Sequence, residues 1–514
     1  MIGGAIAFAA FVLHLCTAWR YGYFRDELYF IACGRHLTWG YVDQPPLVAF
    51  IAWLAQPVHD ELLALRLLAC LAAALTAYTG AAIARELGGG RFAQWLAGVA
   101  VALTPAYLLL GNVLTTTSFE PLSWTLVIAL VIPSVTNHVS VVEGRATIAR
   151  TWLALAAVIA FGLYGKYSMA LLLAALLVGL LVTRERRILL TPWLPVCAGI
   201  VAIAMLPNLW WQAAHGWPFF AVLQGDAAHR HAFNNGWLLE SQNLAGNAWS
   251  FAVEQLIYTN PLAAPVWLCG LIAPFLVPRL RELRFISIAY VVLFAAAVAL
   301  EAKGYYIIGI YGALFAIGAV VVERAARWLR SALFAAITIS ALVTLPLSIP
   351  VLPIDGFIAY SQALGLTGRN GTPAHVIQPI YAEEFGWNQL ARDVAGVYDA
   401  LPPTTRRATA IYADTYADAG AIDFFGPAYD LPSAISSQNS YWLWGTHGYS
   451  GQTMIAIGAS RFDLLRQYYR SCKLVRTSNE PLKWVVEGPS PIYLCTGATM
   501  PLDQIWPHLK WYGA

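Results

Sequence analysis

Long apolar segments recur along the first 350 residues, and they constrain the fold more than any other feature of the sequence. About 18 or more consecutive apolar residues are enough to cross a bilayer as a helix. The N-terminal segment has no basic region and no clear cleavage site, so we expect it to be a retained first span. Eleven spans are predicted, of which the fifth and sixth are short: 1–19, 62–84, 92–111, 121–136, 151–165, 167–183, 191–212, 251–277, 285–300, 305–322 and 331–350.

The composition excludes several classes of protein. Of the 514 residues, 59% are hydrophobic and only 11% are charged, and the mean hydropathy is +0.59. Soluble domains are nearer half apolar and a quarter charged. The net charge is +3 and no basic cluster stands out. A cytosolic enzyme, a disordered chain and a nucleic-acid binder are therefore excluded, and the chain is expected to be a polytopic α-helical membrane protein.

The last part of the chain has a different character. Residues 351–514 contain no apolar run long enough to span a membrane, and they carry more charge than residues 1–350. We therefore predict a multi-span domain over 1–350 and a water-soluble domain over 351–514. The second domain should contain a helix over 381–400, a strand over 408–413, a helix over 414–425 with Asp414 as N-cap, and strands over 472–477 and 483–488. This pattern predicts a small α/β domain.

The distribution of cations predicts the orientation. With the N-terminus inside the cell, thirteen Lys and Arg residues fall in the cytoplasmic loops and six in the outer loops. Positive charge concentrates in cytoplasmic loops, so this orientation is favoured. An odd number of spans then places the C-terminal domain in the periplasm or outside the cell. The expected location is a bacterial inner (cell) membrane, with surrounding lipids as partners.

The first outer loop contains the most informative charges. Asp26 and Glu27 follow the first span directly, among aromatic residues, and Pro45-Pro46-Leu47 ends the loop. Carboxylates near a membrane surface are costly unless they are paired or functional. An interfacial aromatic belt is the simpler explanation for the neighbouring tyrosines. For the two carboxylates together we favour a function.

The run FRDELYFIACGRHLTWGYVDQPPLVAF resembles the first outer loop of GT-C glycosyltransferases of the protein-mannosyltransferase and aminoarabinose-transferase type. The Asp-Glu pair and Gly-Tyr-Val-Asp-x-Pro-Pro-Leu carry this resemblance. It implies a GT-C fold and transfer of a sugar from a polyprenyl-phosphate donor to an acceptor, with inversion at the sugar. The sugar is left open among mannose, galactose, aminoarabinose and arabinofuranose. The acceptor is left open among lipid, protein and polysaccharide.

The resemblance also implies roles for individual residues. Asp26 is expected to be the catalytic base, and Glu27 to orient Asp26 or the acceptor. Relatives often have Lys or His where this chain has Gln44, so another outer cation must bind the lipid phosphate. Lys303 is preferred, and for Lys166 a snorkelling side chain is an equal alternative. The expected substrate-binding residues are Arg25, Tyr29, Arg35, Asp43, Glu120, Lys166, Lys303, Tyr305 and Tyr306.

Metal sites are left open. Asp26 and Glu120 offer oxygen ligands suited to Mg²⁺ or Mn²⁺, and no cofactor is certain. The long outer loop predicted around 207–250 contains His229 and His231, but two histidines without a third ligand are weak evidence for zinc. Cys472 and Cys495 would lie in the oxidising compartment, where they could pair across adjacent strands.

Two other functions compete with sugar transfer. A transporter or flippase of a lipid-linked glycan would carry charges in the middle of its spans and helices broken by Gly or Pro. Most ionisable residues of this chain instead lie at span ends, Arg66 being an exception. A non-catalytic GT-C scaffold is the third possibility, and the intact pair Asp26 and Glu27 argues against it.

Overall fold

The computed structural model describes residues 2–136, 145–229, 248–366, 379–458, 460–482 and 489–513. The chain divides into two compact units. Unit 1 comprises Met1–Arg20, Leu63–Trp210 and Asn234–Leu352. Unit 2 comprises Tyr21–Leu62, Trp211–Phe233 and Pro353–Ala514. The C-terminal segment therefore packs with two segments from the first 350 residues, and one of these contains Asp26 and Glu27.

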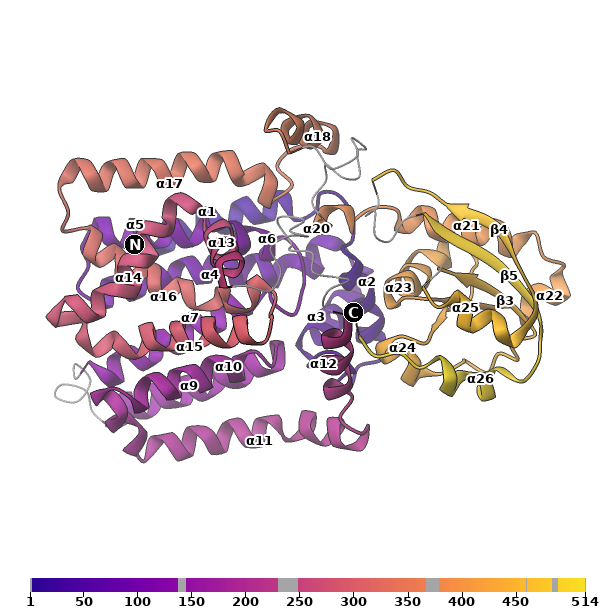
Figure 1. Ribbon diagram of the computed structural model, residues 1–514, viewed down its shortest axis with the longest axis horizontal. Coiled ribbons are helices and arrows are strands. Elements are labelled where there is room, and N and C mark those ends of the chain that lie inside the picture. Colours follow the sequence, from indigo (N-terminus) through magenta and orange to yellow (C-terminus); the bar gives the residue numbers. More distant parts are fainter. Residues whose placement is uncertain are drawn as a thin grey trace. The chain divides into compact units, whose positions relative to one another are not determined.

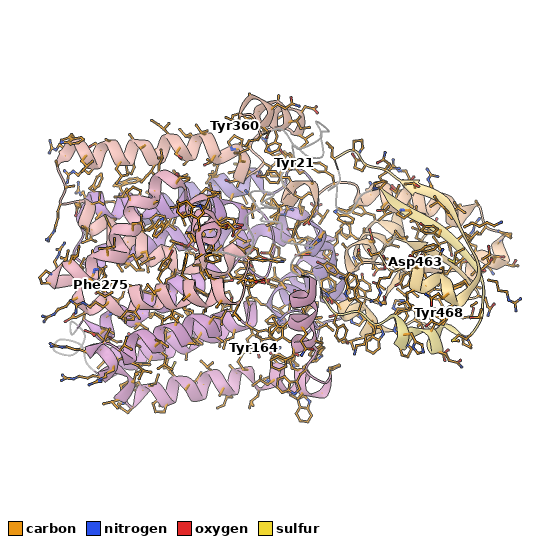
Figure 2. All side chains as sticks on the ribbon, in the orientation of Figure 1. Tyr21, Tyr164, Phe275, Tyr360, Asp463 and Tyr468 are labelled. Atoms are coloured by element: carbon orange, nitrogen blue, oxygen red, sulfur yellow. A yellow bond between two sulfur atoms is a disulfide. The ribbon has the colours of Figure 1, made fainter. Side chains whose placement is uncertain are left out.

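Unit 1 is built from helices, and the long helices α9, α15 and α17 run in roughly the same direction in the view of Figure 1. Apolar side chains such as that of Phe275 are exposed at the surface of the bundle (Figure 2). The helices are α1 (Ile2–Thr17), α4 (Leu62–Glu86), α5 (Arg91–Ala102), α6 (Pro105–Leu110), α7 (Glu120–Val135), α9 (Arg145–Gly165), α10 (Met169–Leu181), α11 (Trp193–Ala214, which continues into unit 2), α13 (Ala248–Tyr258), α14 (Ala264–Leu276), α15 (Arg284–Ala299), α16 (Tyr311–Val322) and α17 (Arg327–Ser348). Short 3₁₀ segments are η2 (Arg184–Leu190), η3 (Pro261–Ala263), η4 (Pro278–Leu283) and η5 (Gly304–Ile310).

Helices occupy all eleven predicted apolar segments, but not all of these helices are long. Among the described residues, six helices are long and apolar enough to cross a membrane, or seven if one bent pair counts as a single span. Other apolar helices, such as α1 and α10, are shorter. A membrane protein with several spans is therefore confirmed, whereas the number eleven remains a prediction.

The predicted span 251–277 is not one continuous helix, because the helix breaks within it. The axes of Ala248–Tyr258 and Pro261–Leu276 are bent by 94°. Asn260 at the break has a left-handed backbone with φ of 68°, and its side chain accepts a hydrogen bond from the backbone N–H of Leu262. Pro261 has no N–H to continue the helix. The Asn-Pro dipeptide thus ends one helix and starts the next.

Small residues set the distance between the helices of unit 1. A Cβ atom placed on Gly270 of α14 would overlap the backbone of α16 at Leu314, and one on Gly318 of α16 would overlap the backbone of α14. Two helices that touch through glycine can approach until their backbones are in contact. This contact packs α14 tightly against α16.

Unit 2 combines helices with one five-stranded sheet (Figure 1). Its helices are α2 (Arg25–Arg35), α3 (Leu47–Ala55), η1 (Gln56–Val58), α12 (Pro218–His229), α18 (Ile354–Ala363), α20 (Pro379–Ala382), α21 (Trp387–Asp399), α22 (Pro403–Ala408), α23 (Tyr416–Phe425), η6 (Gly426–Tyr429), α24 (Asn439–Trp444), α25 (Phe462–Leu465), η7 (Arg466–Tyr468) and α26 (Leu502–Leu509). Its strands are β1 (Ala410–Ala413), β2 (Ile435–Ser436), β3 (Thr453–Ile457), β4 (Tyr469–Ser478) and β5 (Ser490–Ala498).

The sheet has the order β2-β1-β3-β5-β4. β1 is parallel to β2 and β3, whereas β5 is antiparallel to β3 and β4. Alternate residues of β1 and β3 face opposite sides, as the period of two requires. Tyr412 and Met454 join a buried cluster with Ile505 and Leu509 of α26. The central strands β1 and β3 are almost entirely buried, and this cluster packs α26 against them.

The elements of the C-terminal segment agree in part with those predicted from the sequence. The helix α23 begins after Thr415, whose side-chain oxygen accepts a hydrogen bond from the backbone of Asp418, so the predicted N-cap Asp414 is wrong by one residue. Cys472 and Cys495 are cross-strand partners of β4 and β5 and form a disulfide. The predicted strand 483–488 lies outside the described residues.

Candidate active site

Asp26 and Glu27 lie in the first turn of α2, where the helix dipole favours negative charge. Their side chains point to different surroundings. Glu27 is buried, and its Oε2 atom accepts a hydrogen bond of 2.8 Å from the backbone N–H of Phe24, just before the helix. Asp26 is partly open, with 28% of its side chain exposed. Glu27 therefore caps the helix, and Asp26 is the carboxylate of the pair that solvent or a substrate can reach.

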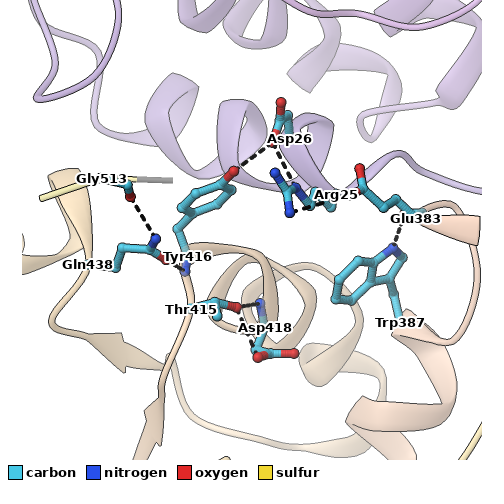
Figure 3. A network of polar contacts seen from close by, with 9 residues as sticks. All are labelled: Arg25, Asp26, Glu383, Trp387, Thr415, Tyr416, Asp418, Gln438 and Gly513. Atoms are coloured by element: carbon cyan, nitrogen blue, oxygen red, sulfur yellow. Dashed lines mark hydrogen bonds and ion pairs between the residues drawn. The ribbon is translucent and has the colours of Figure 1, made fainter. Parts of the chain in front are cut away.

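One oxygen of Asp26 carries both of its polar contacts. Oδ1 accepts a hydrogen bond of 2.8 Å from the phenol of Tyr416 and lies 3.4 Å from Nε of Arg25 (Figure 3). Oδ2 has no polar contact with any residue that the structure describes. The carboxylate is thus fixed through one oxygen, while the other can accept a proton.

Other residues predicted from the first loop surround Asp26 in unit 2. Nη1 of Arg25 lies 3.4 Å from Oε1 of Glu383, which follows α20. The Tyr29 phenol donates a hydrogen bond of 2.8 Å to Oδ1 of Asp43, and its ring lies 4.7 Å from that of Tyr416. Burial, and secondarily the charge of Asp43, raises the pKa of Tyr29 well above its usual value. Tyr29 therefore remains a hydrogen-bond donor at neutral pH.

Arg35 and Gln44 have structural partners. Nη2 of Arg35 lies 3.2 Å from Oδ2 of Asp60, and Nη1 donates to the backbone oxygen of Asp423 at 3.0 Å. Gln44 is buried, and its backbone oxygen accepts a hydrogen bond from the N–H of Tyr41. These contacts fix the two ends of the loop between α2 and α3.

Unit 1 brings together a second group of predicted residues. Nζ of Lys166 lies 3.2 Å from Oε2 of Glu120 and donates to Oγ1 of Thr117 at 2.8 Å. The same ammonium group lies 4.5 Å from the ring centre of Tyr306 and 5.2 Å from that of Tyr305. Lys166 is thus engaged by a carboxylate, a hydroxyl and two aromatic faces.

Glu120 and Lys166 line a narrow crevice in unit 1. The other polar or large side chains of its wall are those of Thr116, Phe119, Ser123, Trp124 and Ser168. Lys166 lies in the break between α9 and α10, outside both helices, and burial lowers its pKa while Glu120 opposes that change. The pair of Lys166 and Glu120 therefore forms part of the wall of this crevice.

Lys303 differs from Lys166 in its surroundings. It precedes η5 with an extended backbone, and its side chain is exposed. It forms no ion pair with any residue in the described part of the chain. Its positive charge contributes, after burial, to lowering the pKa of Lys166. Lys303 is therefore the predicted outer cation whose charge is available to an anionic ligand.

The predicted metal ligands do not form a metal site in the described part of the chain. No group of three or more His, Cys, Asp or Glu side chains is placed there to hold an ion. Glu120 instead faces the ammonium group of Lys166, and Asp26 faces Arg25. The side chains of His229, Arg230 and His231 lie outside the described residues. The helix α11 extends to Ala214, so the predicted loop starts later than residue 207.

Sequence reasoning missed several residues that contact the predicted ones. Tyr416 is separated from Asp26 by 390 positions, and Glu383 belongs to the same distant part of the chain. Thr117 lies between the predicted spans 92–111 and 121–136, and nothing in the sequence links it with Lys166. Because these contacts form only after the chain has folded, no local pattern reveals them.

Comparisons with known proteins agree with this architecture. Residues 43–211, about a third of the chain, match the sequence model of the family described as dolichyl-phosphate-mannose-protein mannosyltransferase. No match was found among curated protein sequences.

Solved structures extend the likeness over nearly the whole chain. The crystal structure of ArnT from Cupriavidus metallidurans bound to undecaprenyl phosphate matches with a TM-score of 0.61 at 15% identity, over 95% of this chain and 96% of that one. Its apo form matches with a TM-score of 0.59 at 13% identity, over the same shares. The oligosaccharyltransferase of Archaeoglobus fulgidus gives 0.47 at 12% identity, over 88% of this chain and 67% of that one. At such identities the structural likeness concerns the fold, because one fold can host many functions.

The predicted resemblance is therefore confirmed: the chain has the membrane GT-C fold, and it resembles glycosyltransferases of the protein-mannosyltransferase and aminoarabinose-transferase type.

Proposed function

We propose that the protein is an inverting glycosyltransferase that moves a sugar from a polyprenyl-phosphate-linked donor to an acceptor at the outer face of the membrane. The fold shared with an ArnT structure that holds undecaprenyl phosphate supports a lipid-linked donor. The match of residues 43–211 to a family of dolichyl-phosphate-mannose-dependent transferases supports the same class of substrate.

The observation that carries the proposal is the geometry of Asp26. Its carboxylate is fixed through Oδ1, whereas Oδ2 is open and the side chain is 28% exposed. A general base needs a fixed carboxylate with one oxygen free to accept a proton from the nucleophile. Glu27, which caps the helix, supports the position of Asp26 from the next residue.

The proposed reaction is a single displacement. The acceptor hydroxyl attacks the anomeric carbon of the donor, and its proton passes to Oδ2 of Asp26. The bond between the anomeric carbon and the phosphate oxygen breaks, and its electron pair leaves with the polyprenyl phosphate. Attack from the face opposite the phosphate inverts the anomeric centre. We assign Lys303 to binding the phosphate, because an available cation stabilises the charge that develops on the leaving group.

The proposed topology is that of a bacterial inner-membrane protein with its N-terminus in the cytoplasm. The excess of thirteen cations over six in alternate loops supports this orientation. If the shorter apolar helices also cross the membrane, the eleven predicted spans place the first loop and residues 351–514 outside. The acceptor is then a lipid, protein or polysaccharide of the cell envelope.

The test uses the full chain, purified and incubated with a membrane extract as acceptor. The donors are undecaprenyl phosphate linked to mannose, galactose, aminoarabinose or arabinofuranose, each labelled in the lipid. We expect release of undecaprenyl phosphate from one donor, and a loss of roughly a thousandfold or more in Asp26→Asn, in which the base is removed without a change of shape. Asp463→Asn is the matched control, because Asp463 is exposed in unit 2.

Each alternative has a distinct result. Transfer of uncleaved donor across intact liposomes, without release of undecaprenyl phosphate, would indicate a transporter. Binding of undecaprenyl phosphate without turnover of any donor would indicate a scaffold. Equal rates for the wild type and Asp26→Asn would remove Asp26 from the role of base.

A further inference from the structure

Tyr416 contacts Asp26 from another part of unit 2. It is the first residue of α23, and its phenol donates a hydrogen bond of 2.8 Å to Oδ1 of Asp26 (Figure 3). The guanidinium of Arg25 lies 5.8 Å from the centre of the Tyr416 ring, so both partners of Oδ1 also touch each other. The oxygen that Asp26 does not offer to a substrate is therefore held by a cation and a phenol.

The position of Tyr416 is fixed by several independent contacts. Its backbone N–H donates to Oε1 of Gln438 at 2.7 Å, and Nε2 of Gln438 donates to the backbone oxygen of Gly513 at 2.9 Å (Figure 3). The Thr415 side chain caps α23 directly before it. The Tyr416 side chain is buried. A buried phenol with a fixed backbone and few free rotamers holds its oxygen in one place.

The close packing of α23 on α2 adds to this precision. A Cβ atom placed on Gly420 would lie 2.9 Å from the backbone carbon of Leu28 and 3.1 Å from the backbone nitrogen of Tyr29. Only glycine therefore permits this distance between the helices. The length of the hydrogen bond between Tyr416 and Asp26 depends on that distance, because the two residues lie at the starts of the packed helices.

The charges around this hydrogen bond keep Tyr416 a donor. Arg25 faces Asp26 from the same helix, Glu383 faces Arg25 from the end of α20, and Asp43 acts on the phenol from the loop after α2. Burial raises the pKa of Tyr416 well above its usual value; Arg25 opposes this change and Asp26 adds to it. The phenol thus remains protonated throughout the pH range of an enzyme assay.

We propose that Tyr416 is a positioning residue for Asp26, and that Gln438 fixes Tyr416 in this role. The inference rests on the proposed function and adds to it a part of the C-terminal segment. The phenol stabilises the charged carboxylate through Oδ1 and turns Oδ2 toward the acceptor hydroxyl. Residues that follow the multi-span region by sequence thereby set the orientation of a base in the first loop.

The test compares Tyr416→Phe with the wild type in the full chain, using the undecaprenyl-phosphate-linked sugar that the wild type consumes. We expect kcat to fall roughly tenfold, because a hydrogen bond to a charged group is lost. The KM of the donor should stay within about twofold, since donor binding does not use this bond. The acid limb of the plot of kcat against pH should move to higher pH, because the hydrogen bond favours the charged carboxylate.

Tyr412→Phe is the matched control. It also removes a buried phenolic O–H in unit 2, one that lies 2.8 Å from Oγ of Ser437, but it does not contact Asp26. Gln438→Leu should lower kcat in the same direction as Tyr416→Phe, with a smaller effect. An unchanged kcat and pH profile in Tyr416→Phe would overturn the inference. Equal losses in Tyr416→Phe and Tyr412→Phe, with equal losses of thermal stability, would show that the phenol only supports the fold.

A second measurement separates this inference from the proposed function. Infrared difference spectra between the wild type and Asp26→Asn isolate the carboxyl band of Asp26 and give its protonation midpoint without turnover. We expect Tyr416→Phe to raise this midpoint and Tyr412→Phe to leave it unchanged. If no donor is consumed by the wild type, the proposed function fails while this readout still decides whether Tyr416 controls Asp26. An unchanged midpoint in Tyr416→Phe overturns the inference in either case.

Discussion

Lys166 and Glu120 form a buried ion pair in unit 1, with Nζ and Oε2 3.2 Å apart and only 1% of the Glu120 side chain exposed. Removing one partner of such a pair leaves a charge without compensation in a poorly solvated place. We therefore expect Lys166→Met to destabilise the chain by about 3 kcal/mol, seen as a lower unfolding temperature of the full chain in detergent.

Two controls accompany this prediction. Lys166→Met combined with Glu120→Gln should recover at least half of the loss, because no buried charge remains. Arg466→Met breaks the exposed pair of Arg466 with Asp463 and should change stability by less than about 0.5 kcal/mol. A double variant that is less stable than Lys166→Met alone would show that the unpaired charge of Glu120 is not the cause of the lost stability.

Lys303 is the exposed cation of unit 1 that the proposal assigns to the donor phosphate. Lys303→Ala should weaken binding of undecaprenyl phosphate roughly tenfold, since a charge-assisted hydrogen bond to phosphate is lost. Binding to the full chain in detergent can be measured by thermophoresis. Lys473→Ala is the control, because Lys473 is an exposed lysine on β4. Equal affinities of Lys303→Ala and the wild type would exclude Lys303 from the phosphate site.

The positions of helices could be predicted where the length and hydropathy of a single segment determine them. The apolar segment 62–84 corresponds to α4 over Leu62–Glu86, since length and hydropathy of one segment decide the outcome. The break at Asn260 was missed, although Asn-Pro is a known turn signal, because the apolar residues on both sides dominate the pattern. Similarly, Asp26 was recognised from its neighbours in sequence.

Partners across the chain could not be predicted in the same way. Nothing in the sequence around Tyr416 indicates that its phenol meets Asp26, because the contact needs the packing of α23 on α2. Glu27 was expected to orient Asp26 or the acceptor, and its cap on Phe24 depends on backbone geometry that composition does not contain. The local sequence thus indicates one residue of each contact, whereas its partner is known only from the folded structure.

Gly420 connects the packing of unit 2 with its chemistry. In Gly420→Ala the new methyl group would lie 2.9 Å from the backbone carbon of Leu28, which cannot move aside as a side chain can. We expect a loss of about 1–3 kcal/mol in stability, and a fall in kcat at temperatures where the protein is still folded. Gly199→Ala is the control, because its Cβ atom meets nothing within 4 Å. Wild-type kcat in a folded Gly420→Ala would separate helix packing from the position of Tyr416.

Asp414 should make stability depend on pH. Burial raises the pKa of its carboxyl above the usual value, against hydrogen bonds from Arg461 and Ser460. The folded protein therefore binds the proton more tightly than the unfolded chain. The stabilisation from this group is complete below the usual pKa of an aspartate and is lost as pH rises through the raised folded pKa.

Asp414→Asn removes this titration and keeps an oxygen that can accept from the backbone N–H of Arg461, which now lies 2.9 Å from Oδ2. We expect the unfolding temperature of Asp414→Asn, relative to the wild type, to be higher at pH 8 than at pH 4. Unfolding of the full chain in detergent, followed by tryptophan fluorescence, measures both temperatures. Asp463→Asn, at an exposed position, should show the same difference from the wild type at both pH values. A constant difference for Asp414→Asn would mean that its carboxyl titrates alike in the folded and unfolded chains, because only a change of pKa on folding can make the difference vary with pH.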